Sequence, residues 1–144
     1  MIRAVRALVV TVLSGLATVR GGLATQRTFR VEADEITFSA LFDRSKIAPQ
    51  GLFGGLPGRG SELLVRRNGE SEFRRFDEVF GVASPTKFTN VVLHAGDELR
   101  YRTPGGGGYG DPADRDRELV REDVAEGYVS AAAAARDYGL EEGA

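Results

Sequence analysis

The residues that could do chemistry begin with a glycine-rich loop. Residues 103–112 read TPGGGGYGDP, and this loop contains Gly105, Gly106, Gly107, Gly108, Tyr109 and Asp111. Glycine lacks a Cβ atom, so it adopts positive φ easily and lets a ligand or another backbone approach closely. A predicted strand precedes the loop, which makes a phosphate cradle one possible chemistry and tight backbone packing the other.

Packing is the favoured interpretation of this loop. A Rossmann motif needs a helix that starts inside the loop, whereas Pro112 and the later helix start disfavour one. A Walker loop needs Gly-Lys-Ser/Thr, and the sequence has no such triplet.

Other chemically active residue types are scattered. Asp43 and Arg44 follow a predicted strand, where they could bind a substrate or, more commonly, form a structural ion pair. Ser84 lacks the context of a nucleophile elbow. His94, the single histidine, lies beside a turn, which favours a surface or capping role. No triad, carboxylate dyad or metal cluster can be assembled from these residues, so we predict no catalytic residue and no metal site in this chain.

Composition limits the classes of function. The chain has 144 residues, 42% of them hydrophobic, which suits a globular domain. A net charge of −2 argues against charge-driven nucleic-acid binding. The absence of cysteine excludes disulfides and thiol catalysis and fits a reducing compartment, so we expect a cytoplasmic protein.

The N-terminal stretch differs from the rest. Arg3 and Arg6 precede an apolar run at residues 7–19, a pattern weakly typical of a secretory signal. The run is too short to span a bilayer, so we expect no membrane partner. The alternatives are a buried element or an extension outside the domain.

Hydrophobic periodicity predicts mostly strands, followed by two helices. Strands are expected at residues 28–31, 36–42, 62–67, 73–76, 90–94 and 98–102, and helices at 117–125 and 131–138. Hairpin turns are expected at 33–35, 68–69 and 95–97. Asn68-Gly69 favours a type I′ turn, while Ser130 and Gly139 suit the two ends of the last helix.

The fold class that follows is α+β. We predict a β-rich body of antiparallel strands and Gly/Pro-rich loops with a C-terminal pair of short helices. Residues 1–19 would form an extension, 20–112 the β-rich domain, and 113–144 an acidic tail that carries nine acidic and four basic residues.

A second glycine-rich loop, at residues 48–58, contains Leu52, Phe53, Gly54 and Gly55. Apolar side chains in a loop need a surface to pack against. The domain's own core is the favoured surface, and a partner subunit is the alternative, in which Leu52 and Phe53 would be anchors.

Several motifs together resemble the C-terminal end of the hydantoinase B/oxoprolinase family. They are RGGL at 20–23, DR at 43–44, PQGLFGGLPG at 49–58, SPTKF at 84–88, TPGGGGYGDP at 103–112, and the downstream pattern DxxLVxxDVxxGYVS…A…DYG. The resemblance implies a partnership with large A-type and B-type subunits. It also implies ATP-dependent hydrolysis of cyclic amides such as hydantoins and 5-oxoproline, or carboxylation of ketones.

The same resemblance implies where the chemistry lies. The family's metal ligands belong to a long N-terminal part that this sequence does not contain, so ATP and a divalent metal are expected on partner subunits. We expect a small subunit or split C-terminal part within a hetero-oligomer, as in an acetophenone carboxylase-type complex. The alternatives are a structural fragment without chemistry and an exported binding domain.

Overall fold

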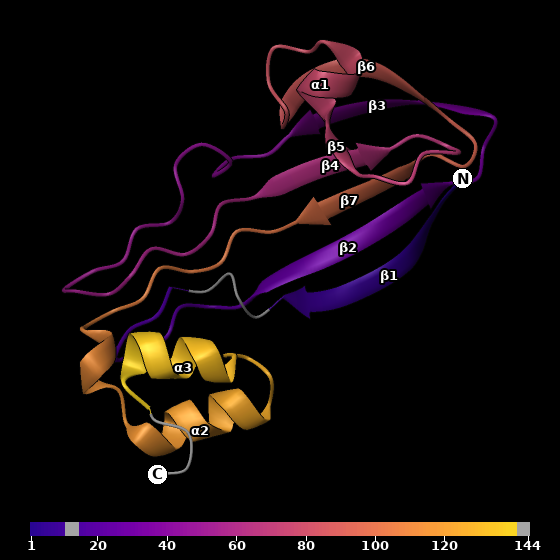
Figure 1. Cartoon of the computed structure of the whole chain (residues 1–144). Helices are drawn as coiled ribbons and strands as arrows, with labels where there is room; N and C mark the ends of the chain where they lie inside the picture. Colours follow the sequence, from indigo (N-terminus) through magenta and orange to yellow (C-terminus); the bar gives the residue numbers. More distant parts are fainter. Residues whose placement is uncertain (11–14, 141–144) are drawn as a thin grey trace. The chain divides into compact units, whose positions relative to one another are not determined.

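The computed structural model describes residues 1–10 and 15–140 and has an α+β fold, as predicted (Figure 1). Its elements are β1 (Ile2–Val10), β2 (Ala24–Val31), β3 (Glu35–Leu41), β4 (Glu62–Arg66), β5 (Arg74–Arg75), α1 (Phe76–Phe80), β6 (Lys87–His94), β7 (Glu98–Arg102), the 3₁₀ helix η2 (Pro112–Asp114), α2 (Arg117–Ala125) and α3 (Ala131–Tyr138). None of the helices in the described ranges is long and apolar enough to cross a membrane.

The chain forms two compact units, each built from three separate stretches. One, which we call the sheet unit, comprises Met1–Leu8, Thr25–Lys46 and Ser61–Thr103. The other, the glycine-loop unit, comprises Val9–Ala24, Ile47–Gly60 and Pro104–Ala144. Each unit therefore depends on contacts between segments that are far apart in the sequence.

The sheet unit contains two antiparallel sheets. One has the strand order β1-β2-β7-β4-β5 and the other pairs β3 with β6. Alternating apolar residues from both sheets form a common core that includes Val31, Leu63, Val65, Leu93 and Leu99. The predicted alternation in β3 is confirmed in part, since Ile36, Phe38 and Phe42 all pack against this core, with a register shift between Phe38 and Ala40.

Two of the predicted hairpins are wrong. β2 pairs with β7 rather than with β3, and β7 pairs with β2 and β4 rather than with β6. In both cases the short connection joins strands of different sheets. Local turn residues mark the change of direction, but the burial of both apolar faces decides which strands pair.

The Asn68-Gly69 turn occurs, but its type differs from the prediction. Gly69 has φ of +86° whereas Asn68 does not have positive φ, and Glu70 N–H donates to the Arg67 carbonyl at 3.0 Å. This pattern is typical of a type II turn rather than type I′. A longer connection then leads to β5, which pairs with β4 through Arg74 and Arg75.

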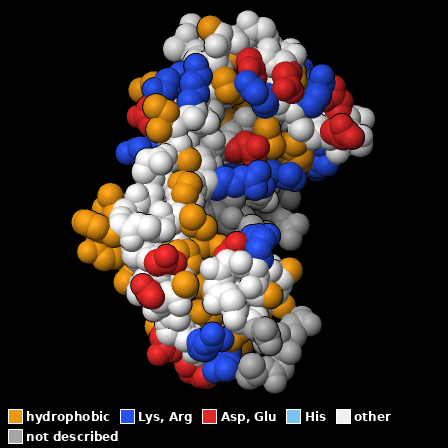
Figure 2. Space-filling model, turned by 60° about the vertical axis from the view of Figure 1, so that its left-hand side comes forward, with side chains coloured by type: hydrophobic (Ala, Val, Ile, Leu, Met, Phe, Trp, Pro, Cys, Tyr) orange, Lys and Arg blue, Asp and Glu red, His pale blue; other side chains and the backbone are white. Residues whose placement is uncertain are grey.

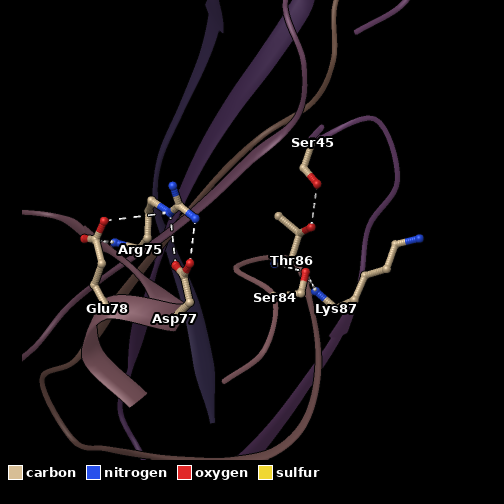
Figure 3. Close-up of polar contacts among 7 residues, drawn as sticks. All are labelled: Ser45, Arg75, Asp77, Glu78, Ser84, Thr86 and Lys87. Carbon is tan, nitrogen blue, oxygen red and sulfur yellow. Dashed lines mark hydrogen bonds and ion pairs between the residues drawn. The ribbon is translucent and has the colours of Figure 1, made fainter. Parts of the chain in front are cut away.

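The predicted return strand at residues 73–76 is confirmed in part: β5 covers Arg74–Arg75 and pairs with β4, and α1 begins at Phe76. Figure 3 shows the polar contacts at its start: the Arg75 guanidinium pairs with Asp77, and Arg75 N–H donates to Glu78 at 3.2 Å. Two acidic residues in a first turn favour a helix start. Phe76 is fully buried and stacks on Phe88 at 4.5 Å between ring centroids, so the helix still delivers its apolar residue to the core.

The two C-terminal helices are confirmed to the residue. Asp116 caps α2 by accepting from Glu118 and Leu119, and Ser130 caps α3 by accepting from Ala133 N–H. Gly139 ends α3 with φ of +64°. A second small core joins the helices through Val120, Val129, Ala134 and Tyr138.

A buried carboxylate orders the turns of the sheet unit. Asp97 is 1% exposed, and its two oxygens accept from Asn68 N–H and His94 N–H, both at 2.9 Å. Arg67 Nε lies 3.3 Å from the same carboxylate. Asp97 therefore ties the turn after β4 to the turn after β6.

We predict that Asp97→Ala lowers the free energy of unfolding by about 2 to 4 kcal/mol, because two backbone N–H groups lose their acceptor. Urea unfolding monitored by circular dichroism measures the change. Asp34→Ala is the matched control, since Asp34 is exposed, and a change within about 0.5 kcal/mol is expected there. Equal stability of the two variants would contradict the role of Asp97.

Candidate functional site

The glycine-loop unit is built on main-chain hydrogen bonds between three segments. Gly105 and Gly108 N–H donate to the carbonyls of Arg59 and Leu56, both at 3.0 Å. Gly106 N–H donates to Gly22 at 2.8 Å, and Tyr109 N–H to Val19 at 3.0 Å. We call the assembly of residues 15–22, 50–59 and 105–110 the glycine mesh.

The bonding pattern of the glycine mesh has a period of three. The donors Gly105 and Gly108 are three residues apart in the segment 105–110. Their acceptors, Arg59 and Leu56, are also three residues apart but run in the opposite direction along the segment 50–59. The pairs Gly106 with Gly22 and Tyr109 with Val19 repeat the same step. Three residues per turn without internal hydrogen bonds is the geometry of polyproline II, so consecutive N–H groups face different neighbours.

Close approach explains why these positions are glycine. A Cβ on Gly107 would lie 1.9 Å from the Gln50 carbonyl oxygen, and one on Gly55 would lie 2.2 Å from that of Gly108. A Cβ on Gly15 would lie 2.1 Å from the Leu56 oxygen. None of the residues 105–108 has positive φ. The requirement is therefore space for another backbone, as the packing interpretation predicted, rather than an unusual conformation.

The same bonds occupy the groups that a phosphate would need. The N–H groups of Gly105, Gly106, Gly108, Tyr109 and Gly110 all donate to backbone carbonyls. A phosphate cradle uses such N–H groups as free donors. The loop thus offers these five donors to protein rather than to an anion.

Leu52 and Phe53 do not pack into the core, contrary to the favoured expectation. They are 60% and 77% exposed, and Tyr109 beside them is 53% exposed. Leu52 N–H donates to Gly108 and its carbonyl accepts from Gly110, each at 2.9 Å, so the backbone faces the mesh and the side chain remains exposed. The rings of Phe53 and Tyr109 lie 5.0 Å apart.

With Val19, 62% exposed, these side chains form what we call the apolar cluster: Val19, Leu52, Phe53 and Tyr109. Val19 and Leu52 each form a bridge with Tyr109. Hydrophobic side chains are visibly gathered on the face shown in Figure 2. A group of exposed apolar side chains on a rigid backbone is typical of an interaction surface.

Two further predicted site residues support the mesh. Asp111 caps η2 by accepting from Ala113 N–H at 2.9 Å, and its carbonyl accepts from the Thr18 hydroxyl at 2.7 Å. Gly54 has φ of +92° and lies against the backbone of Asp111. These contacts give both residues a role in shaping the loops.

Asp43 and Arg44 belong to the sheet unit and do not pair with each other. The Asp43 carboxylate accepts from Lys87 Nζ, and this hydrogen bond lowers the pKa of Asp43. Arg44 adopts φ of +64°, and its carbonyl accepts from Ser61 N–H at 3.0 Å. The expected structural ion pair therefore forms, but Lys87 is the cation that pairs with Asp43.

The remaining polar residues singled out from the sequence also have structural contacts. The Ser84 hydroxyl accepts from the N–H groups of Thr86 and Lys87 at 3.4 and 3.2 Å, and Ser45 bonds to Thr86 (Figure 3). His94 Nδ1 lies 3.9 Å from an oxygen of Glu35. Across residues 1–10 and 15–140, no three His, Asp or Glu side chains are grouped so as to hold a metal ion.

An ion triad in the glycine-loop unit escaped the sequence analysis. Asp123 is 6% exposed and accepts from Arg20 Nε at 3.2 Å and Arg115 Nη2 at 2.9 Å. Arg20 also lies over the Tyr128 ring, 5.3 Å from its centroid. Arg20, Asp123 and Tyr128 all belong to the quoted motifs, so the motif pattern was the signal that could have grouped them.

The sheet unit also contains an apolar cavity of about 300 Å³. It is lined by Ile2, Phe29, Phe38, Phe42, Leu63, Leu99 and Tyr101. Burial raises the pKa of Tyr101, which stacks on Phe42 at 4.3 Å between centroids. The lining is apolar apart from that hydroxyl, so the cavity offers little to orient a reacting group.

Comparison with known proteins gives the family. Residues 11–112 match the profile of the family described as hydantoinase B/oxoprolinase. A protein of Methanocaldococcus jannaschii is 36% identical over 86% of this chain and 20% of its own length. A protein of Pseudomonas sp. (strain NS671), named as the putative B-type subunit of a D-/L-hydantoinase, is 32% identical over 84% of this chain and 19% of its own length.

Solved structures with the same fold include larger enzymes. An acetone carboxylase has a TM-score of 0.70 at 21% identity, covering 97% of this chain and 22% of its own. The ATP-dependent caprolactamase of Pseudomonas jessenii has a TM-score of 0.72 at 20% identity, covering 99% of this chain and 24% of its own.

This chain therefore belongs to the hydantoinase B/oxoprolinase family, as its motifs indicated. It spans about a fifth of the length of the relatives that it matches.

The glycine mesh makes a paired prediction about stability. Gly107→Ala should lower the free energy of unfolding by about 3 kcal/mol or more, because the new Cβ requires two backbones to separate. Gly22→Ala is the control, since a Cβ there meets nothing within 4 Å and its φ is not positive. Thermal unfolding by calorimetry compares the two, and a Gly107→Ala variant as stable as Gly22→Ala would refute the packing account.

Proposed function

We propose that this chain completes a larger hydantoinase B-type chain within an ATP-dependent complex that hydrolyses cyclic amides or carboxylates ketones. It would act as a small subunit or split C-terminal part in the cytoplasm, in an assembly of the acetophenone carboxylase type. Support comes from the family membership, from a relative named as a hydantoinase subunit, and from the ATP-dependent caprolactamase that shares the fold.

The observation that carries this proposal is the apolar cluster. Its side chains are 53% to 77% exposed, yet the backbone that presents them is fixed by the glycine mesh. Preorganised apolar and aromatic anchors lose little conformational freedom on binding and often dominate the energy of an interface. A rigid display of this kind is suited to docking against a protein partner.

The size of the relatives supports a large B-type chain as the proposed partner. They are single chains about five times as long as the part that this chain matches. In the relatives, the region that matches this chain is part of one long chain. Here, this chain would contact the corresponding large B-type chain across a subunit interface. ATP and a divalent metal would then be bound by the large A-type and B-type subunits, and the substrate would react there.

A structural or interaction fragment without chemistry is the second candidate. It is favoured by the contacts of Ser84, Asp111 and Asp123, each of which is used to cap or tie the backbone. Both candidate functions predict that the chain assembles with larger subunits, but they differ in how this assembly affects the activity of the complex. A subunit should be required for ATP-dependent activity of the complex, whereas a fragment should not.

The test is a pull-down from the native host with tagged chain carrying Phe53→Asn. Asparagine tolerates the left-handed backbone at this position, where φ is +51°, so the fold should persist while an apolar anchor is lost. We expect recovery of the large A-type and B-type subunits to fall at least about tenfold, the usual effect of losing an interface hot spot.

Leu41→Ser is the matched control, because Leu41 is 79% exposed but belongs to the sheet unit. It should recover the large subunits as well as the unchanged chain does. Equal recovery with Phe53→Asn would rule out docking through the apolar cluster. Adding the unchanged chain to depleted large subunits and measuring ATP-dependent lactam opening or carboxylation then separates the subunit from the fragment.

A further inference from the structure

The polar face of strands β4 and β7 carries ordered ion pairs, with one exception in the part of the chain that the structure describes. Arg66 Nη2 lies 2.7 Å from Glu98 Oε2, and Arg102 Nη1 lies 2.7 Å from Glu62 Oε2. In both pairs the residues are direct cross-strand neighbours. Arg100 lies between Glu98 and Arg102 on the same face, because alternate residues of a strand share a face.

Arg100 has no carboxylate partner within the described ranges. Its cross-strand neighbours are Leu64 on β4 and Thr28 on β2, neither of which is charged. Its Nε is buried and has no hydrogen-bond partner among residues 1–10 and 15–140. A buried donor of a charged group normally has a partner, and leaving it without one is costly.

An aromatic ring holds this unpaired cation in place. The Arg100 guanidinium carbon lies 3.7 Å from the centroid of the Phe73 ring, and that of Arg66 lies 4.8 Å from the same centroid. Stacking on an aromatic face is favourable for arginine and fixes the plane of the guanidinium group. Arg100 is thus preorganised, but its charge is not neutralised.

The surroundings of Arg100 are electrostatically unfavourable for its charged form. Burial lowers the pKa of Arg100, the nearby charges of Arg102 and Arg66 lower it further, and the charges of Glu98 and Glu62 only partly oppose them. On β4 and β7, Glu62 forms an ion pair with Arg102 and Glu98 forms one with Arg66. Arg100 therefore has no ion-pair partner on these two strands. A single negative charge placed beside the guanidinium group would relieve the repulsion from Arg102 and Arg66.

We propose that Arg100, stacked on Phe73, is a binding site for the carboxylate of a ligand or of an acidic side chain. The planar guanidinium fork matches a carboxylate in two parallel hydrogen bonds. A carboxylate supplies one negative charge, which would compensate the positive charge of Arg100. Carboxylates are also the groups that pair with the neighbouring Arg66 and Arg102. The site lies in the sheet unit and is independent of the apolar cluster.

The experiment is an acetate titration of the ¹⁵N-labelled 144-residue chain at pH 7, with sodium acetate replacing sodium chloride at constant ionic strength. A buried Nε–H exchanges slowly with water, so its resonance is observable, and the Arg100→Gln variant assigns it. As the acetate concentration rises, we expect the chemical shift of the Arg100 Nε–H resonance to change and then saturate. The backbone amide resonances of Leu64 and Thr28 should shift over the same concentration range.

Three variants make the test specific. Arg100→Gln should abolish the shifts at Leu64 and Thr28, and Phe73→Leu should weaken acetate binding several-fold while keeping the charge. Arg27→Gln should leave binding unchanged, because Arg27 is exposed and pairs with Tyr101 in the β2–β7 register, on the opposite face of the sheet. Thermal unfolding confirms that each variant is folded.

The outcomes are distinct. A linear response without saturation, or the same response in Arg100→Gln, would overturn the site. Tighter binding of inorganic phosphate than of acetate would overturn its assignment to carboxylates. If N-acetylglutamate methylamide binds at least as tightly as acetate, an acidic side chain is the supported source; if acetate alone binds, a free small carboxylate is.

Discussion

Backbone-to-backbone contact at glycine is the constraint on which the glycine-loop unit depends. Segments around Gly15, Gly55 and Gly107 approach so closely that any Cβ would overlap a carbonyl oxygen. Because amides of residues 105–109 bond to the two other segments in steps of three, the segments hold one another without forming a regular sheet or helix. The entropy cost of ordering so many glycines is offset by hydrogen bonds between the segments, together with bonds within them such as Gly21 to Gly15 and Gly55 to Leu52.

This constraint also determines what the unit presents to other molecules. With the backbone directed inwards, the side chains of Leu52 and Phe53 remain exposed. Such an exposed apolar surface is typical of a contact with another protein. Family membership and the length of the relatives fit the same view, since the homologous region is a minor part of each larger protein.

Local signals in the sequence predicted much of the secondary structure. The limits of α2 and α3 were correct because Asp116, Ser130 and Gly139 act within one turn of the helix that each begins or ends. Most strand positions were also found, although β1 was not, and of the three predicted hairpins only the pairing of β4 with β5 around Asn68-Gly69 was correct. Which strand lies beside β2 or β7 depends on the burial of whole faces, and a three-residue turn such as 95–97 contains no information about that.

The candidate site was predictable to a similar degree. Glycine density indicated close packing, yet nothing in the sequence revealed that Gly105 would bond to Arg59 or Gly106 to Gly22. The roles of Asp97, Asp123 and Arg100 were missed. Whether a charged side chain has a hydrogen-bond or ion-pair partner depends on residues that the fold brings together, and these are not neighbours in the sequence.

The measurement that tests the central claim most directly is the native mass of the tagged chain from its own host, obtained by size-exclusion chromatography with light scattering. The account predicts elution with large subunits, including an ATP-using chain, at a mass far above the 15.5 kDa of the chain itself. Elution as a compact monomer would contradict the assembly role and leave the apolar cluster without a protein partner.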